Sequence, residues 1–304
     1  MIGKPYFIIN EHVYWQPLSE NPNAIHLIEQ NIDKVDWEYL SRNPNAIHIL
    51  EKNIDKINWW WLSQNPNAIS IIKNNLNKVD WNGLSKNPNS ISILEKNLDK
   101  ICFKKLSTNK NAIHLIEKNL NKIDNVLLSA NQNAISILEN HPKLIYWDWL
   151  SYNKNAIHLL EKNPDKISWF ALSLNPNAIH LLEKNLDINI NSNDPDIDKV
   201  NWKFLSKNPN ANSILEKNID KIDWSWLSEN PNAIHLLEKN LDKVCWFRLS
   251  ANPNAIHLLA KLDYEKMKNH QFNQELIEYV MNPDRLLRLC KYYDISFEDL
   301  LQFY

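Results

Sequence analysis

Histidine is the residue type whose repetition most suggests chemistry in this 304-residue chain. Evenly spaced imidazoles could hold a ladder of metal ions or form a pH-sensitive stripe. Zinc, however, needs ligands that converge to about 2.0–2.1 Å from one ion, and equivalent positions of stacked units stand a packing layer apart. We therefore expect a polar outer position with no metal and no cofactor. The histidines share this repeated position with serines: His26, His48, His114, His158, His180, His235 and His257, and Ser70, Ser92, Ser136 and Ser213.

Charged side chains recur with the same regularity. Glu51, Lys52, Asp55 and Lys56 have equivalents in most units. Paired carboxylates can do acid–base work, but they need distinct environments that separate their pKa values, whereas these alternate with lysines and predict a solvated charge ladder. The sequence has no P-loop, HExxH, GxGxxG or nucleophile elbow, and its two glycines could hardly build a phosphate-binding loop. We predict no catalytic residues and no enzymatic activity.

Two segments outside the regular pattern carry residues that could form a site. An insertion at about 188–198 carries oxygen side chains at the spacing of a calcium loop, but Ser192 stands where glycine is needed and Pro195 is awkward there. We expect a flexible loop that binds no metal. A non-repeated enzyme pocket could be housed only by the C-terminal segment with Asp284, Arg285 and Cys290.

The period behind these patterns is 22 residues. Eleven units follow W-x-x-L-S-x-N-P-N-A-I-[HS]-L-L-E-K-N-[LI]-D-K-[IV]-x, and we number positions 1 to 22 from the first residue of this pattern. One unit is longer by 11 residues. Such a repeat predicts an all-α tandem-repeat solenoid, because a single unit cannot bury its own apolar face. The units begin at Trp15, Trp37, Trp59, Trp81, Phe103, Asn125, Trp147, Trp169, Trp202, Trp224 and Trp246.

Each unit is predicted to contain one α-helix and one short helix, either 3₁₀ or a single turn. We expect Asn43 to cap a helix of about 10 residues that starts at Pro44 and ends at Asn53 in a left-handed C-cap. Asp36 should cap the short helix, and the Trp at position 1 should lie in the core. Asn212 replaces an apolar residue and needs a polar partner.

The units are expected to stack into a rod or arc on the order of 100 Å long, at roughly 8–10 Å per helix layer. Residues 15–266 would form the eleven-repeat solenoid. Residues 1–14 would cover its first repeat as an N-terminal cap, and residues 267–304 would form a C-terminal helical cap.

The repeat resembles two known families. Leu40, Asn43, Pro44 and Leu50 are similar to positions of the variant leucine-rich repeat, a solenoid of alternating α and 3₁₀ helices. More closely, the LSxNPNAIHLLEKNxDKIxW pattern with its PDRLLRLC tail resembles an uncharacterised repeat family of giant DNA viruses, over nearly the whole chain. The resemblance implies a viral protein that acts in an infected host cell and implies little about activity.

The positions that differ between repeats are the ones that can encode a partner. Positions 2, 3 and 6 carry exposed aromatic residues of the kind enriched in interface hot spots, although packing between layers would explain them equally well. We predict a non-enzymatic scaffold that binds a host or viral protein. The alternative is binding of single-stranded nucleic acid (RNA) along a face of these aromatic residues and the lysines at positions 16 and 20, which the net charge of −2 disfavours. The candidate residues are Tyr39, Trp60, Trp61, Trp149, Tyr152, Phe170, Phe204, Trp226 and Phe247.

The same composition bears on where the protein acts. The N-terminus does not resemble a signal peptide, and no apolar run approaches the roughly 20 residues of a membrane span. Cys102, Cys245 and Cys290 are far apart and form no CxxC, which fits a reducing compartment. We expect a soluble intracellular protein in the host cytoplasm, with the virion as a second possible location and no membrane partner.

Overall fold

The computed structural model describes residues 7–189 and 200–263 of the chain. These residues belong to two compact units, of which the larger spans His12–Ile256. The described part of the smaller unit contains the antiparallel strands β1 (Phe7–Ile9) and β2 (Ala260–Leu262), in which Ile8 pairs with Lys261. The predicted C-terminal cap lies outside the described residues, as does most of the insertion at 188–198.

Every repeat contributes a short helix that begins at its first position. Asp36 starts such a helix in the second repeat, as predicted, because its carboxylate accepts hydrogen bonds from the backbone N–H groups of Glu38 and Tyr39. These eleven helices, called the inner helices below, are α1 (Trp15–Glu20), α3 (Trp37–Arg42), α5 (Trp59–Gln64), α7 (Trp81–Lys86), α9 (Phe103–Leu106), α11 (Asn125–Ala130), α13 (Trp147–Tyr152), α15 (Trp169–Leu172), α17 (Trp202–Lys207), α19 (Trp224–Leu227) and α21 (Trp246–Ala251).

A second α-helix follows in each repeat after the turn at positions 7–10. These outer helices are α2 (Ile25–Gln30), α4 (Ile47–Glu51), α6 (Ile69–Asn74), α8 (Ile91–Leu94), α10 (Ile113–Glu117), α12 (Ile135–Asn140), α14 (Ile157–Glu161), α16 (Ile179–Asn189), α18 (Asn212–Lys217), α20 (Ile234–Glu238) and α22 (Ile256–Leu259). Short 3₁₀ turns accompany them: η1 (Pro22–Ala24), η2 (Ile54–Lys56), η3 (Leu98–Lys100), η4 (Pro142–Leu144), η5 (Pro164–Lys166), η6 (Ile219–Lys221) and η7 (Leu241–Lys243).

The all-α repeat architecture is confirmed, but the division of each repeat differs from the prediction. The outer helix α4 begins at Ile47 and not at Pro44, because the Asn43 side chain closes a turn by accepting from the N–H of Asn45. Asn53 does end the helical segment, yet its φ of −135° is not left-handed. Its side chain donates instead to the carbonyl of Ile49 at 2.9 Å.

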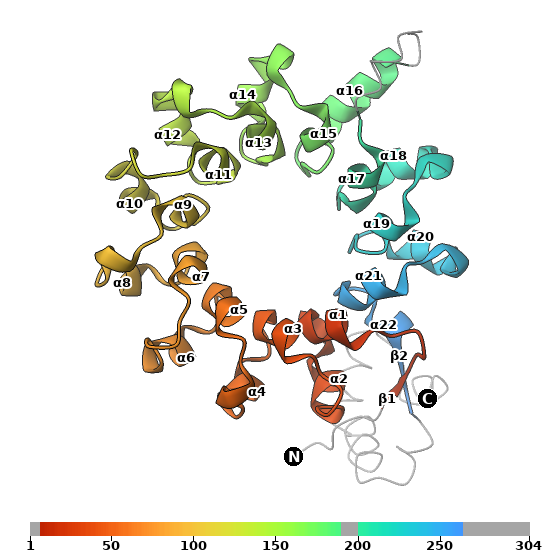
Figure 1. Ribbon diagram of the computed structural model, residues 1–304. Coiled ribbons are helices and arrows are strands. Elements are labelled where there is room, and N and C mark those ends of the chain that lie inside the picture. Colours follow the sequence, from red (N-terminus) through yellow and green to blue (C-terminus); the bar gives the residue numbers. More distant parts are fainter. Residues whose placement is uncertain (1–6, 190–199, 264–304) are drawn as a thin grey trace, which may run out of the picture. The chain divides into compact units, whose positions relative to one another are not determined.

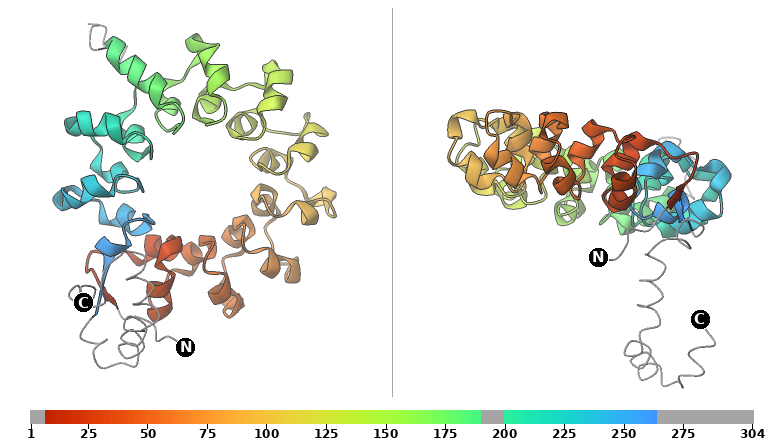
Figure 2. Two further views of the ribbon diagram at one scale, coloured as in Figure 1. Left: turned by 180° about the vertical axis from the view of Figure 1, so that it is seen from behind. Right: turned by 90° about the horizontal axis from the view of Figure 1, so that it is seen from below.

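The two helices of a repeat lie in two layers of the larger unit. Figure 1 shows α1, α3, α5 and their successors on the inside of a ring, with α2, α4, α6 and their successors on the outside. The reverse view and the edge-on view in Figure 2 show the same order of layers. The core lies between them and is built from positions 4, 10 and 14, where Leu40, Ala46 and Leu50 are fully buried.

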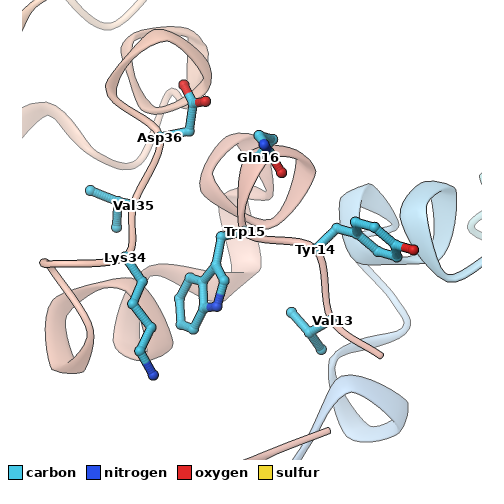
Figure 3. A pocket seen from close by; sticks show the side chains of 7 residues that line it. All are labelled: Val13, Tyr14, Trp15, Gln16, Lys34, Val35 and Asp36. Atoms are coloured by element: carbon cyan, nitrogen blue, oxygen red, sulfur yellow. The ribbon is translucent and has the colours of Figure 1, made fainter. Parts of the chain in front are cut away.

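The Trp at position 1 is half-buried, so its prediction as a core residue is wrong. A lysine from the end of the same repeat covers its outer side: the Lys56 ammonium lies 4.7 Å from the centroid of the Trp37 ring. Figure 3 shows the equivalent pair in the first repeat, where Lys34 and Trp15 point in the same direction. Cation–π attraction lets a large ring stay at the boundary of the core without full burial.

Buried asparagines join each repeat to the one before it. Asn43 is fully buried, and its side-chain amide donates to the carbonyls of Ser19 and Asn21, both at 3.0 Å. Asn45 adds a bond from its amide to the carbonyl of Pro22. Within a repeat, the Ser41 hydroxyl donates to the carbonyl of Trp37 and accepts from the N–H of Asn58. These bonds satisfy polar backbone that the stacking of short helices would otherwise leave buried and unpaired.

The same bonds close the larger unit on itself. Asn21 of the first repeat donates to the carbonyls of Ser250 and Asn252 in the eleventh, at 3.1 and 3.0 Å. Asn23 donates to Pro253, and the N–H of Tyr14 donates to the Ser250 hydroxyl. Helix α1 thus packs on α21 as it packs on α3. The prediction of an open rod or arc is therefore wrong, because the repeats curve steadily in one sense until the first meets the last.

Within residues 7–189 and 200–263, none of the helices is both long and apolar enough to span a bilayer.

Candidate interaction surface on the inner helices

The positions that vary between repeats lie on the inner helices. Positions 2, 3 and 6 fall in these helices or within two residues of their ends, whereas the histidines of position 12 lie on the outer helices. All nine predicted partner-binding residues are therefore in the inner layer. The structure divides them into two groups and three further residues, and the groups differ in what surrounds the aromatic rings.

The first group surrounds Arg42. The guanidinium carbon of Arg42 lies 3.2 Å from the centroid of the Trp61 ring and 4.8 Å from that of Tyr39. Arg42 also pairs with Glu20 at 3.3 Å and with Glu38 at 3.5 Å, and the Trp61 indole N–H donates to Glu38. We call this set the Arg42 cluster. The guanidinium of Arg42 interacts with both aromatic side chains and both carboxylates, so Tyr39 and Trp61 contribute to the packing between neighbouring repeats.

Trp226 lies in a second set of internal charges. The cations of Lys207 and Arg248 lie 5.2 and 4.3 Å from its ring centroid, and Glu229 pairs with both of them. The Lys203 ammonium also lies 5.2 Å from the ring. Trp226 is thus covered by cations of its own chain and offers little free ring face to a partner.

The remaining group forms a pocket of about 540 Å³ on α13, α15 and α17. Rings of Phe170 and Phe204 meet edge to face at 4.5 Å between centroids. Trp149, Tyr152 and Phe170 are 43, 44 and 55% exposed, so their apolar surface is open to solvent. The lining of this aromatic pocket is Asp148, Trp149, Tyr152, Ser168, Phe170, Ala171, Leu174 and Phe204. It comes from three successive repeats and unites four of the nine predicted residues.

Two predicted residues are exposed outside the pocket. Trp60 is 44% exposed and packs edge to face against Trp61, with 4.1 Å between centroids. Phe247 is also 44% exposed and lies 5.5 Å from Tyr14, on the other side of the junction between the first and last repeats. Figure 3 shows Tyr14 directed toward the helices of the last repeats. These two residues do not add to the aromatic pocket, and they provide matched controls for it.

The outer helices carry a belt of paired side chains. His48 Nε2 lies 2.7 Å from the Glu29 carboxylate, and the same pairing of position 12 with position 15 of the preceding repeat recurs at His114, His158, His180 and His235. Ser70 makes the equivalent bond to Glu51. No three potential metal ligands gather anywhere in the described part of the chain. Burial lowers the pKa of His26 from its ordinary value, although the Glu29 carboxylate opposes the shift.

The lysines of position 16 do not share one face with the variable aromatic residues. Lys56 and its equivalents at position 20 cover the Trp rings of position 1, while Lys52 at position 16 follows an outer helix. The alternative of a nucleic acid held between these lysines and the aromatic residues of positions 2, 3 and 6 needs both on one surface. The two layers separate Lys52 and its equivalents from those aromatic residues.

Sequence reasoning missed the residues that hold the ring together. Leu at position 4, Ser at 5 and Asn at 7 and 9 occur in all eleven repeats, whereas the Trp of position 1 and the Pro of position 8 are replaced in some. That internal invariance was a signal for buried polar bonds between units. Asp148 and Leu174 of the pocket were also not predicted from the sequence. The pocket is built from three repeats, so no sequence pattern within a single repeat indicates it. The side-chain amide of Asn212 donates to the carbonyl of Asn232 at 2.7 Å, whereas its buried Oδ1 accepts no hydrogen bond from the described residues.

No protein family, curated protein or solved structure matches the chain.

Proposed function

We propose that this protein is a non-enzymatic scaffold that binds another protein through the inner helices of its ring. The observation that carries the proposal is the aromatic pocket, where Trp149, Tyr152 and Phe170 remain open to solvent in a layer whose other Trp residues at position 3 are covered by internal cations. Exposed Trp and Tyr side chains on a rigid frame are the typical anchors of protein interfaces.

The residues that hold the repeats together, at positions 4, 5, 7 and 9 and called the frame below, are different from the proposed binding residues. Leu40, Asn43 and their equivalents fix each junction, so positions 2, 3 and 6 can differ without loss of the fold. The resemblance of the repeat to a giant-virus family supports a host or viral protein as the partner and an infected cell as the place of action. Under this proposal the protein needs no cofactor and no membrane.

The test is capture of partners by the tagged full-length protein from host-cell lysate, with and without nuclease. The pocket variant is the double change Trp149→Ser and Phe170→Ser. The matched control is Trp60→Ser with Phe247→Ser, which removes two aromatic residues of similar exposure outside the pocket. Each captured protein is then purified and its Kd is measured with all three forms of the ring.

We expect a defined partner that survives nuclease and loses at least about tenfold in affinity with the pocket variant, since truncated hot-spot aromatic residues cost on the order of 2 kcal/mol. The control variant should bind within about twofold of the parent. Loss of the captured material with nuclease would replace the proposal by nucleic-acid binding. Equal affinities of the pocket and control variants would refute the pocket as the binding surface.

A further inference from the structure

The side chain at position 3 of a repeat lies against two residues of the preceding repeat. Trp61 donates its indole N–H to Glu38, at position 2 of that repeat, and its ring lies against Arg42, at position 6. Trp226 is approached in the same way by the ammonium groups at positions 2 and 6 of its preceding repeat, both 5.2 Å from its ring centroid. Positions 2 and 6 thus form two sides of a place that position 3 of the next repeat fills.

The eighth repeat does not fill this place. Its residue at position 3 is Ala171, whose side chain is a single methyl group. The two sides remain, because Asp148 at position 2 and Tyr152 at position 6 of the seventh repeat line the aromatic pocket of about 540 Å³ together with Ala171. The pocket therefore corresponds to the volume that an indole occupies at position 3 of the third and tenth repeats.

A small residue at position 3 is not sufficient to leave such a pocket. Gly83 holds this position in the fourth repeat, but a Cβ there would lie 2.9 Å from the carbonyl oxygen of Trp60 and 3.1 Å from the Cγ of Gln64. The preceding repeat thus closes on the glycine and leaves no room for a side chain. Beside Ala171, by contrast, the space stays open.

The lining of the pocket offers an indole the kinds of contact that Trp61 has. Asp148 is a carboxylate at the position of Glu38, which accepts the Trp61 indole N–H at 3.1 Å. Phe170 stands at the position of Trp60, whose ring meets Trp61 edge to face at 4.1 Å between centroids. A hydrogen-bond acceptor and an aromatic ring are therefore in place without the indole that their equivalents contact.

We infer that the aromatic pocket binds a tryptophan side chain of the protein partner, inserted where position 3 of the eighth repeat carries only Ala171. This inference rests on the proposed function and names the group by which that surface recognises its partner. The indole N–H would donate to Asp148, and the ring would pack against Tyr152 and Phe170. Tryptophan is also among the residues most enriched in the hot spots of protein interfaces.

An indole suits the pocket better than other side chains. A phenyl ring or an aliphatic side chain would fill apolar space but would donate no hydrogen bond to Asp148. The place of a cation is already taken, because Tyr152 stands at the position that Arg42 has in the second repeat. Relative to the Arg42 cluster, the group that the pocket lacks is the indole of position 3.

The experiment uses the full chain labelled with 5-fluorotryptophan, with the Trp149 resonance assigned by its loss in Trp149→Phe. The probe is N-acetyl-tryptophan amide, titrated while the fluorine spectrum is recorded. Its 1-methyl derivative, which lacks the indole N–H, and the amides of N-acetyl-phenylalanine and N-acetyl-tyrosine are titrated in parallel. We expect the tryptophan probe to shift the Trp149 resonance with a Kd in the millimolar range. Each of the other probes should bind at least about fivefold more weakly, the effect of one lost hydrogen bond or of a smaller ring.

Two variants test the mechanism without changing the frame. Ala171→Trp should fill the pocket from within, as Trp61 fills the equivalent place, and should abolish the shift of Trp149 by the probe. Lys105→Trp adds a Trp at position 3 of the fifth repeat, outside the pocket, and is its control. Asp148→Ala should weaken the tryptophan probe about fivefold and leave its 1-methyl derivative unchanged. Circular dichroism of each variant verifies that the helices remain.

The outcomes separate this inference from the proposed function. No shift of Trp149 by the tryptophan probe, or binding of the 1-methyl, phenylalanine or tyrosine probe as tight as that of the tryptophan probe, overturns the inference. A captured partner that is lost with the pocket variant but is retained by Ala171→Trp also overturns it, while the scaffold proposal stands. If the tryptophan probe binds as expected and no protein partner is found, the pocket chemistry holds and the scaffold proposal fails.

Discussion

Trp61 and Trp149 occupy the same third position of their repeats, yet they face different surroundings. Trp61 is covered by Arg42 at 3.2 Å and donates its indole proton to Glu38. Trp149 is 43% exposed beside an unfilled pocket of about 540 Å³. The inner helices that carry the two residues have the same length, and the junctions below them have the same hydrogen bonds. The cation that covers Trp61 stands at position 6 of the preceding repeat, where the repeat before Trp149 has Ala130.

That difference teaches how a regular ring acquires a local site. In the Arg42 cluster, position 6 supplies a cation that completes the packing of its own chain. In the repeat before Trp149, position 6 is Ala130, which supplies no cation. The pocket itself lies toward the following repeats, where Ala171 stands at position 3, the position that Trp61 has in the Arg42 cluster. Trp61 and Trp149 thus have different surroundings because the residues of their neighbouring repeats differ.

The comparison requires that both regions rest on the same frame, which predicts the largest effect. Asn65→Ala and Asn153→Ala should each lower the free energy of unfolding by roughly 2–4 kcal/mol. Each buried side chain donates to two carbonyls and accepts from one N–H, and its loss leaves these groups unpaired. Urea unfolding followed by circular dichroism measures both variants.

The control for this prediction is the exposed asparagine two residues later. Asn67→Ala and Asn155→Ala each remove a bond to one carbonyl at an exposed position and should cost less than about 1 kcal/mol. A large difference between Asn65→Ala and Asn153→Ala would show that the two regions do not share an equivalent frame.

Position 6 itself should give the next largest effect. Arg42→Ala should cost about 1–2 kcal/mol of unfolding free energy, because it removes two cation–π contacts and the packing of the stem. Tyr152→Ala, at the same position in the pocket, should cost less than about 1 kcal/mol, since the ring is 44% exposed. Chemical denaturation of the two variants side by side measures the difference.

Arg42→Lys provides the control, because it keeps the charge and loses the flat stacking, and it should recover part of the loss. If Tyr152→Ala were as costly as Arg42→Ala, the pocket aromatic residues would be part of the packing of the ring, and the distinction between the two regions would fail.

Most of the architecture could be predicted from the sequence because the same 22-residue pattern occurs in eleven units. The 22-residue period, the capping by Asp36 and the apolar positions Leu40 and Leu50 follow from pattern and local chemistry alone. Ring closure could not be predicted, because it depends on a small rotation between neighbours that accumulates over eleven junctions. The aromatic pocket was missed as a unit for a related reason: its residues are drawn from three repeats, and only the curvature brings them together.

The smallest predicted effect extends the comparison to the outer layer, where His26 and His48 occupy equivalent positions. Burial lowers the pKa of His26 in the folded protein, so the unfolded chain binds this proton more tightly. The contribution of His26 to stability should therefore be complete above the unfolded value of about 6.5 and should be lost as the pH falls from there toward the lower folded pKa. The unfolding free energy of the parent and of His26→Gln, measured between pH 7.5 and pH 5, should converge on acidification. A gap that stays constant or widens would show that burial of the His26 ring does not govern its titration, and His48→Gln gives the reference for an exposed histidine paired with Glu29.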